Sequence, residues 1–142
     1  DLLYLPLAGE RLVLAEFPFL MSAPRGIEAL TALVQAGYRP VLAHVERYRY
    51  IQHDPEPWLE RLQALGVWLQ CNVGSLVGMH GPAPQVFARQ LLQRELPVIW
   101  STDLHRPRQI QRYIAPGLRQ LSHLGRLNAR LDDLDSTAGA GR

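Results

Sequence analysis

Val41-Leu42-Ala43-His44 is a short apolar run that follows Pro40 and ends on a histidine. Continuous apolar runs of this length are typical of strands covered on both faces in α/β proteins. Upstream, apolar residues recur at helical spacing from Ile27 to Val34, and Gly37 supplies a C-terminal stop for the helix they predict. The sequence therefore predicts a helix followed by a buried strand with a histidine at its end.

The same alternation continues in both directions. Further strands are predicted over Arg11–Phe17, Val67–Asn72 and Val98–Ser101, and further helices from Asp54 to Gly66, around Val86–Leu92, and over Gln109–Leu134 with an interruption at Pro116-Gly117. Strands that alternate with helices of this length imply right-handed crossovers and a parallel sheet or barrel. At about 30 residues per unit, 142 residues hold only four or five of the eight units of a full barrel. The predicted fold is therefore α/β, a partial distorted (β/α) barrel with parallel strands.

Composition excludes several classes of protein. A net charge of +2, with fifteen basic and thirteen acidic residues scattered along the chain, argues against nucleic acid as a partner. No apolar stretch approaches the roughly 18 residues of a membrane span, which predicts no membrane insertion. The single cysteine, Cys71, sits in an apolar run, so we expect a buried, unreactive thiol and a reducing, cytoplasmic location.

Polar residues recur where the predicted strands end. Glu16, His44, Asn72 and Asp103 are spaced 28, 28 and 31 residues apart. The C-terminal ends of parallel strands surround one site, so these side chains are expected to converge. Carboxylate and imidazole groups bind zinc, iron or manganese, which makes Glu16, His44, Asp103 and His105 candidate metal ligands. Each also has an ordinary alternative, as a solvated loop residue, a helix or turn cap, or a core histidine.

Arginines accompany these candidates. Arg47 follows His44 by three residues, and Arg106 and Arg108 follow Asp103 and His105. A guanidinium beside metal ligands suits a phosphoester, because it can bind two phosphate oxygens at once. The alternative for Arg47 is an ion pair with a neighbouring acid.

The remaining reactive side chains are given structural roles. His53, His80 and His123 lack a partner at metal-ligand spacing and are assigned surface or capping roles. The glycine-rich stretch 74–81 lacks the Gly-Lys-Ser/Thr ending of a phosphate-binding loop. Ser75 lacks the pattern of a nucleophile elbow.

Four segments together resemble a known family. They are Leu14–Phe17, Gly37–Tyr48 with its Ala-His-Val-Glu-Arg-Tyr ending, Gln70–Gly78, and Ser101–His105 with its Ser-Thr-Asp-Leu-His reading. In this order and spacing they resemble the bacterial CpsB/CapC-type tyrosine phosphatases, which belong to the PHP (polymerase and histidinol phosphatase) superfamily. The likeness runs from about Leu12 to His105, and the segment around His44 is its most specific part.

The resemblance implies a distorted barrel of PHP type that holds two or three metal ions, often manganese, and hydrolyses phosphomonoesters. By motif match, Glu16, His44, Asp103 and His105 would be metal ligands, and Arg47 would bind the phosphate. The family carries a further arginine several residues after the last of these histidines, whereas here Arg106 and Arg108 come early and Arg112 comes late. We take Arg108 as this second, catalytic arginine. Water activated by the metals would attack phosphorus. The implied substrate is phosphotyrosine on a bacterial tyrosine kinase that controls capsular or exopolysaccharide synthesis.

The chain departs from the family pattern in ways that leave two other functions open. Val45 and Leu104 replace the usual proline and alanine, and no His-x-His pair occurs anywhere. We therefore expect residues 1–135 to be the C-terminal part of a PHP phosphatase domain, and residues 136–142 to be a flexible tail. One alternative is a catalytically incomplete module for binding or assembly, completed by a second copy into a homo-oligomer. The other is an enzyme that hydrolyses a small phosphorylated metabolite.

Overall fold

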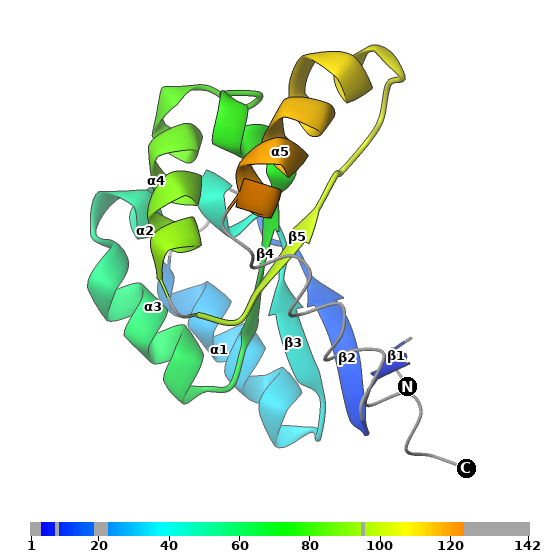
Figure 1. Ribbon diagram of the computed structural model, residues 1–142. Helices are drawn as coiled ribbons and strands as arrows, with labels where there is room; N and C mark the ends of the chain where they lie inside the picture. The colour runs from blue at the N-terminus through cyan, green and yellow to red at the C-terminus, as the bar shows by residue number, and fades with distance from the viewer. Residues whose placement is uncertain (1–3, 8, 19–22, 95, 124–142) are drawn as a thin grey trace.

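A computed structural model of the chain contains a curled five-stranded sheet in the order β1-β2-β3-β4-β5. It describes residues 4–7, 9–18, 23–94 and 96–123. The strands are β1 (Leu5–Leu7), β2 (Glu10–Ala15), β3 (Arg39–Leu42), β4 (Trp68–Asn72) and β5 (Val98–Ser101). The pairs β2–β3, β3–β4 and β4–β5 are parallel, as Figure 1 shows. The predicted α/β class with a partial parallel barrel is confirmed.

Strand β1 was not predicted. It pairs antiparallel with β2 through Leu5↔Leu12 and Leu7↔Glu10 and forms one edge of the sheet. Three residues are too short for a periodic pattern, and Pro6 inside them argues against a strand on sequence grounds. An edge strand tolerates proline because one side of it has no neighbour to receive the missing N–H. The sheet is therefore parallel except at this edge.

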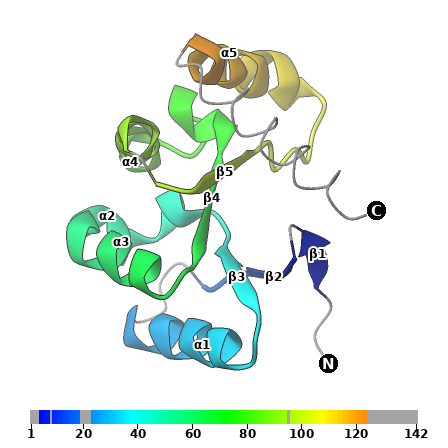
Figure 2. The same cartoon turned by 60° about the horizontal axis from the view of Figure 1, so that its bottom comes forward.

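Helices lie along the outer side of the curled sheet (Figure 2). The α-helices are α1 (Ala23–Gln35), α2 (Arg49–His53), α3 (Pro55–Ala64), α4 (Pro82–Gln93) and α5 (Ala115–His123), and the shorter helical turns are η1 (Val45–Arg47), η2 (Val73–Val77) and η3 (Ile110–Ile114). Helix α1 begins four residues before Ile27, where its apolar pattern starts. Asp54 holds the cap position of α3, as predicted, but its side chain makes no capping hydrogen bond.

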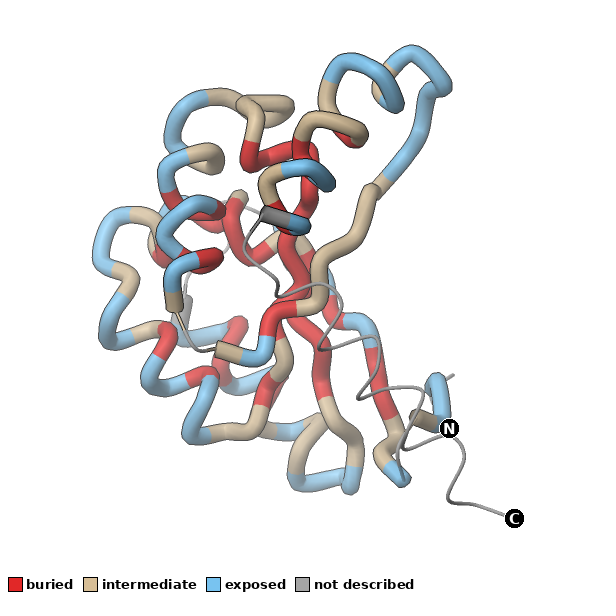
Figure 3. The backbone as a smooth tube through the Cα atoms, viewed as in Figure 1, coloured by how far each residue is buried: buried red, intermediate tan, exposed pale blue. Residues whose placement is uncertain are grey.

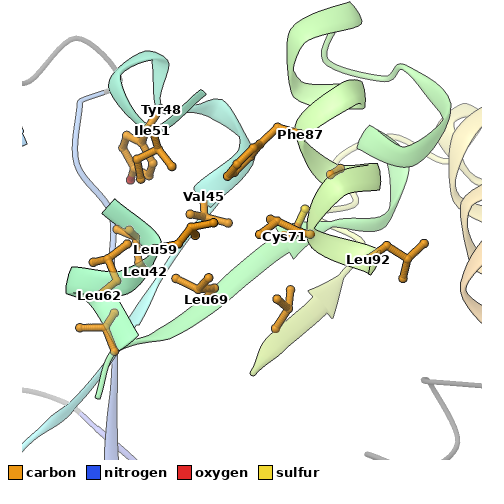
Figure 4. Close-up of a cluster of buried hydrophobic side chains, with 14 of the residues drawn as sticks. Leu42, Val45, Tyr48, Ile51, Leu59, Leu62, Leu69, Cys71, Phe87 and Leu92 are labelled. Carbon is orange, nitrogen blue, oxygen red and sulfur yellow. The ribbon is translucent and has the colours of Figure 1, made fainter. Parts of the chain in front are cut away.

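The hydrophobic core fills the space between strands and helices. The strand register aligns Ala15 with Leu42, Leu42 with Leu69, and Leu69 with Val98, so these residues form one row facing the helices. All are buried in one cluster with side chains of the helices, and Figure 4 shows Leu42 beside Leu59 of α3. Period-two alternation puts Leu14 on the opposite face, where 68% of it is exposed. The core thus fixes one face of the sheet and leaves apolar surface on the other.

The last helical region runs through the predicted interruption. A π-helical turn, η3, precedes α5 directly, and Pro116 lies at the second position of α5. Proline lacks the N–H that a regular helix would use there, and a wide turn just before it accommodates that loss. The expected extension to Leu134, and the expected tail at 136–142, lie outside the described residues.

Gly117 is where α5 touches the loop that follows β4. A Cβ placed on it would meet the backbone oxygen of Val73 closer than real Cβ atoms approach, and would lie 2.8 Å from Val73 Cγ1. Figure 3 shows buried, intermediate and exposed residues along α5, and Gly117 is one of the buried ones.

Gly117→Ala is therefore expected to lower the free energy of unfolding by about 1 to 3 kcal/mol, the usual cost of overpacking a tight contact. Chemical denaturation monitored by far-UV circular dichroism measures it. Arg119→Ala, at an exposed position of the same helix, is the matched control and should change little. Equal stabilities of the two variants would contradict the close packing.

No helix within the described residues is long and apolar enough to cross a membrane.

Candidate functional site: the rim at the strand ends

The four candidate ligands lie together at the C-terminal ends of the parallel strands. Glu16 follows β2, His44 follows β3 by two residues, and Asp103 follows β5 by two residues. His44 Nε2 lies 4.0 Å from Glu16 Oε1, and His44 Nδ1 lies 3.9 Å from Asp103 Oδ2. His105 Nε2 lies 3.1 Å from Asp103 Oδ1. The structure thus links all four in a row with the partly buried His44 at its centre.

His44 and Asp103 share an unusual backbone conformation. Their φ angles are 52° and 44°, and in the described part of the chain they are the only non-glycine residues with positive φ. Left-handed backbone costs a residue with a side chain roughly 1 to 2 kcal/mol. Such strain persists where the surrounding structure enforces it, and it clusters at functional sites. At both strand ends the backbone is thus held in the conformation that turns these two side chains toward each other.

Polar side chains of β4 and β5 orient His44 through a network of hydrogen bonds. The His44 backbone N–H donates to Gln70 Oε1 at 2.7 Å, and Gln70 Nε2 donates to Asn72 Oδ1 at 3.0 Å and Ser101 Oγ at 2.8 Å. The Asn72 amide lies against His44 Nδ1, with its Nδ2 at 3.1 Å. The sequence marked Asn72 only as a strand end. Gln70 was not predicted as a site residue, although two polar residues at alternate positions of a buried strand indicate hydrogen-bonded side chains beside a site.

Glu46 and Tyr48, two and four residues after His44, hold neighbouring strand ends together through hydrogen bonds. Glu46 is buried, and its Oε1 accepts the Asn72 backbone N–H at 3.2 Å and the Ser75 hydroxyl at 2.8 Å. Burial raises the pKa of the Glu46 carboxyl. Tyr48 is also buried, and its hydroxyl accepts the Phe17 backbone N–H at 3.0 Å, one residue after Glu16. These two side chains tie the ends of β2, β3 and β4 together.

Tyr48→Phe removes that link while keeping the ring. The Phe17 N–H then loses its acceptor, which costs about 1 to 3 kcal/mol when such a group is buried and less when water reaches it. We therefore expect urea denaturation to show a loss of about 1 kcal/mol. Tyr50→Phe is the matched control, because the described structure gives that hydroxyl no hydrogen bond. A Tyr48→Phe protein as stable as the control would show that the bond holds nothing.

The candidate arginines lie on two sides of this rim. Arg47 is partly buried in η1, and its positive charge is one of the causes that lower the pKa of His80. Arg108 lines a pocket of about 390 Å³ together with Arg106 and Arg112. The structure therefore puts Arg108 next to the Asp103–His105 segment but gives it no advantage over the two other arginines.

The pocket is joined directly to the candidate ligands. Gln109, which also lines it, accepts the backbone N–H groups of His105 and Arg106 through its Oε1, at 3.1 and 2.9 Å. The Arg112 guanidinium lies over the Tyr113 ring, 5.1 Å from its centroid. Three guanidiniums beside the rim can attract and hold an anion.

The cysteine and the other histidines were expected to have structural roles. Cys71 is a buried free thiol, as predicted, and burial followed by the neighbouring Glu46 charge raises its pKa well above the usual value. His80 is partly buried, and its Nδ1 lies 2.9 Å from Ser75 Oγ, a contact that the expected surface or capping role did not include. His53 lies exposed at the end of α2. The side chain of His123 lies outside the described residues.

The side chains at the rim are of the types that bind divalent metals, but they do not form a complete ligand set for one ion. Two carboxylates and two imidazoles are the groups that Zn²⁺, Fe²⁺ and Mn²⁺ accept. The contacts run pairwise along one row, from Glu16 to His44, from His44 to Asp103 and from Asp103 to His105. Across the described residues, no group of three or more such side chains is close enough to hold one metal ion. These residues would therefore supply part of each ion's ligand set.

Fold and rim together define a class: a parallel α/β half-barrel with carboxylate, imidazole and guanidinium groups at its strand ends. The sequence profile of the family described as "Capsular polysaccharide synthesis, CpsB/CapC" matches residues 3–124. The chain belongs to the CpsB/CapC family.

One curated protein and one solved structure show the same relationship. The chain is 36% identical over 102 residues to tyrosine-protein phosphatase YwqE of Bacillus subtilis (strain 168), an alignment that covers 71% of this chain and 39% of YwqE. A solved structure matches with a TM-score of 0.60 and 31% identity, over 70% of this chain and 40% of the other. It comes from work on YwqE and on CpsB from Streptococcus pneumoniae, described as unique metal-dependent tyrosine phosphatases. This chain spans about two fifths of the length of the relatives it matches.

Proposed function

We propose that this chain carries the C-terminal half of the active site of a metal-dependent protein-tyrosine phosphatase. Its substrate is phosphotyrosine on a bacterial tyrosine kinase that regulates capsular or exopolysaccharide synthesis, and the reaction takes place in the cytoplasm. The observation that carries the proposal is the strained pair His44 and Asp103, held 3.9 Å apart at the ends of two strands. The relatives named above are tyrosine phosphatases, which supports the same substrate.

Each rim residue has a role in this proposal. Glu16, His44, Asp103 and His105 hold part of a cluster of two or three metal ions, with manganese as the ion we favour. Bound metal supplies positive charge that polarises the phosphoryl group and acidifies water. Arg47 and Arg108 bind the phosphate oxygens, because a guanidinium matches a phosphate with two parallel hydrogen bonds. Gln70 and Asn72 keep the His44 ring in place, as the second layer of a metal site does.

Glu16→Gln tests the ligand assignment. We expect the protein with manganese to release phosphate from a phosphotyrosine peptide, and the variant to lose that activity together with bound manganese, because an amide is a poor ligand for a hard cation. Metal content after gel filtration gives a readout independent of turnover. Glu28→Gln, at an exposed position of α1, is the matched control. Unchanged activity and metal content in Glu16→Gln would remove Glu16 from the site.

A second candidate function rests on one observation. Because the described residues contain no group of three or more metal-binding side chains, a catalytically incomplete module for binding or assembly is the alternative. Its exposed apolar surface, of which Leu14 is part, would then be covered by a second copy of the chain. A metal-free dimer in sedimentation velocity would favour this module, and a metal-loaded active monomer would exclude it.

Faster turnover of sugar phosphates than of the peptide would instead indicate a small phosphoester as substrate.

A further inference from the structure

A hydrogen-bonded chain leads from the core to His80. The Ser75 hydroxyl donates to the buried Glu46 Oε1 at 2.8 Å, and Ser75 Oγ lies 2.9 Å from His80 Nδ1. A hydroxyl has one proton, and Ser75 gives it to Glu46, so Ser75 Oγ must accept from His80 Nδ1–H. Neutral His80 is thereby held in the tautomer whose Nε2 carries the lone pair. Within the described structure, that Nε2 has no hydrogen-bond partner.

The loop that carries His80 is firmly built. Met79 N–H donates to Gly74 O at 3.0 Å, and Gly78 N–H donates to Ser75 O at 3.1 Å. From α4, Gln85 and Arg89 both donate to the Leu76 carbonyl, at 3.2 and 3.1 Å. His80 is thus positioned by both its side-chain bond and its backbone.

The location of this loop places His80 at the rim. It follows β4, which lies between β3 and β5 in the sheet, and these two strands carry His44 and Asp103 at their ends. Burial and then the Arg47 charge lower the pKa of His80, Asp103 raises it, and His44 lowers it further. The charged groups that act on His80 are therefore those of the proposed phosphate and metal site.

We propose that His80 is the general acid of this site: its Nε2 takes a proton from solvent, and the resulting Nε2–H protonates the leaving tyrosine oxygen. The inference rests on the proposed function. As the water oxygen bonds to phosphorus, the bond from phosphorus to the tyrosine oxygen breaks and its electron pair passes to that oxygen, which takes the proton from imidazolium Nε2. The proton released by the attacking water goes to solvent, and solvent reprotonates His80. Ser75 and Glu46 are positioning residues that hold the imidazole through Nδ1.

The choice of leaving group tests this role. Tyrosine has a pKa near 10 and needs a proton as it leaves, whereas nitrophenol is far more acidic and leaves without one. His80→Asn keeps an N–H donor for Ser75 and removes the transferable proton. We expect it to lower kcat about a hundredfold on a phosphotyrosine peptide, within the usual range for general acids, and less than about tenfold on nitrophenyl phosphate. His53→Asn, at an exposed position at the end of α2, is the matched control.

Nitrogen-15 NMR of the histidine side chains gives a second readout that does not depend on turnover. Wild-type His80 is expected in the Nδ1–H tautomer, and Ser75→Ala is expected to shift it toward Nε2–H. Equal kcat losses on both esters, or an Nε2–H tautomer in the wild type, would overturn the role of His80 and leave the phosphatase standing. A wild-type protein with bound manganese that hydrolyses neither ester would overturn the proposed function and this role together.

Discussion

Asp103→Asn is expected to abolish phosphatase activity while leaving the protein at least as stable as the wild type. Replacing a second-layer partner of a metal ligand typically costs 10- to 100-fold, so loss of a ligand carboxylate should cost about a hundredfold or more. Stability should not follow, because an asparagine side chain has the same size and tolerates the left-handed φ of 44° at this position at least as well. Turnover of a phosphotyrosine peptide and urea denaturation measure the two effects on one preparation.

Two further variants separate the effect of the side-chain charge from the effect of the backbone conformation. Asp54→Asn changes an aspartate that lies at the start of α3 without a capping hydrogen bond, and it should change neither quantity. Asp103→Gly removes the side chain and the backbone strain together, so it should be inactive and more stable than the wild type by about 1 kcal/mol. An active Asp103→Asn protein would exclude Asp103 as a ligand. A strongly destabilised one would show that the carboxylate holds the fold together.

The architecture could be predicted because its signals are local. Apolar runs such as Val98–Ser101, and helical spacing between them, identify each parallel strand and each crossover without knowledge of distant contacts. Convergence of Glu16, His44 and Asp103 then follows from topology, since parallel strands bring their ends to one rim. Strand β1 was not predicted, because three residues that include a proline carry no such signal.

The supporting chemistry could not be predicted because it is set by three-dimensional contacts. Nothing in the residues around His80 shows that Ser75 reaches it, or that Glu46 in turn holds Ser75 from a different strand end. The same holds for Tyr48, whose hydroxyl bonds Phe17 across 31 residues. Sequence patterns likewise did not show that Arg106, Arg108 and Arg112 line one pocket. Sequence patterns locate ligand types, whereas the residues that orient them depend on packing.

Glu46→Ala is expected to be the most destabilising of the variants considered. It would leave the Asn72 backbone N–H and the Ser75 hydroxyl without an acceptor in the core and would open a cavity where the buried side chain lies. Each unsatisfied group costs about 1 to 3 kcal/mol, so we expect a loss of about 3 kcal/mol or more in urea denaturation. Glu46→Gln keeps an oxygen for both donors and should lose much less.

The pH dependence of stability distinguishes charge from hydrogen bonding at this position. Because burial raises the pKa of Glu46 above its usual 4.5, the folded state holds this proton more tightly than the unfolded state. Its contribution to stability is complete below pH 4.5 and is lost as the pH rises through the folded-state pKa. Glu46→Gln cannot ionise, so its stability relative to the wild type should increase from pH 4.5 toward pH 8. Glu28→Gln, whose glutamate is exposed on α1, should run parallel to the wild type. A constant difference between Glu46→Gln and the wild type across this range would mean that Glu46 titrates normally and that its hydrogen bonds alone hold the strand ends together.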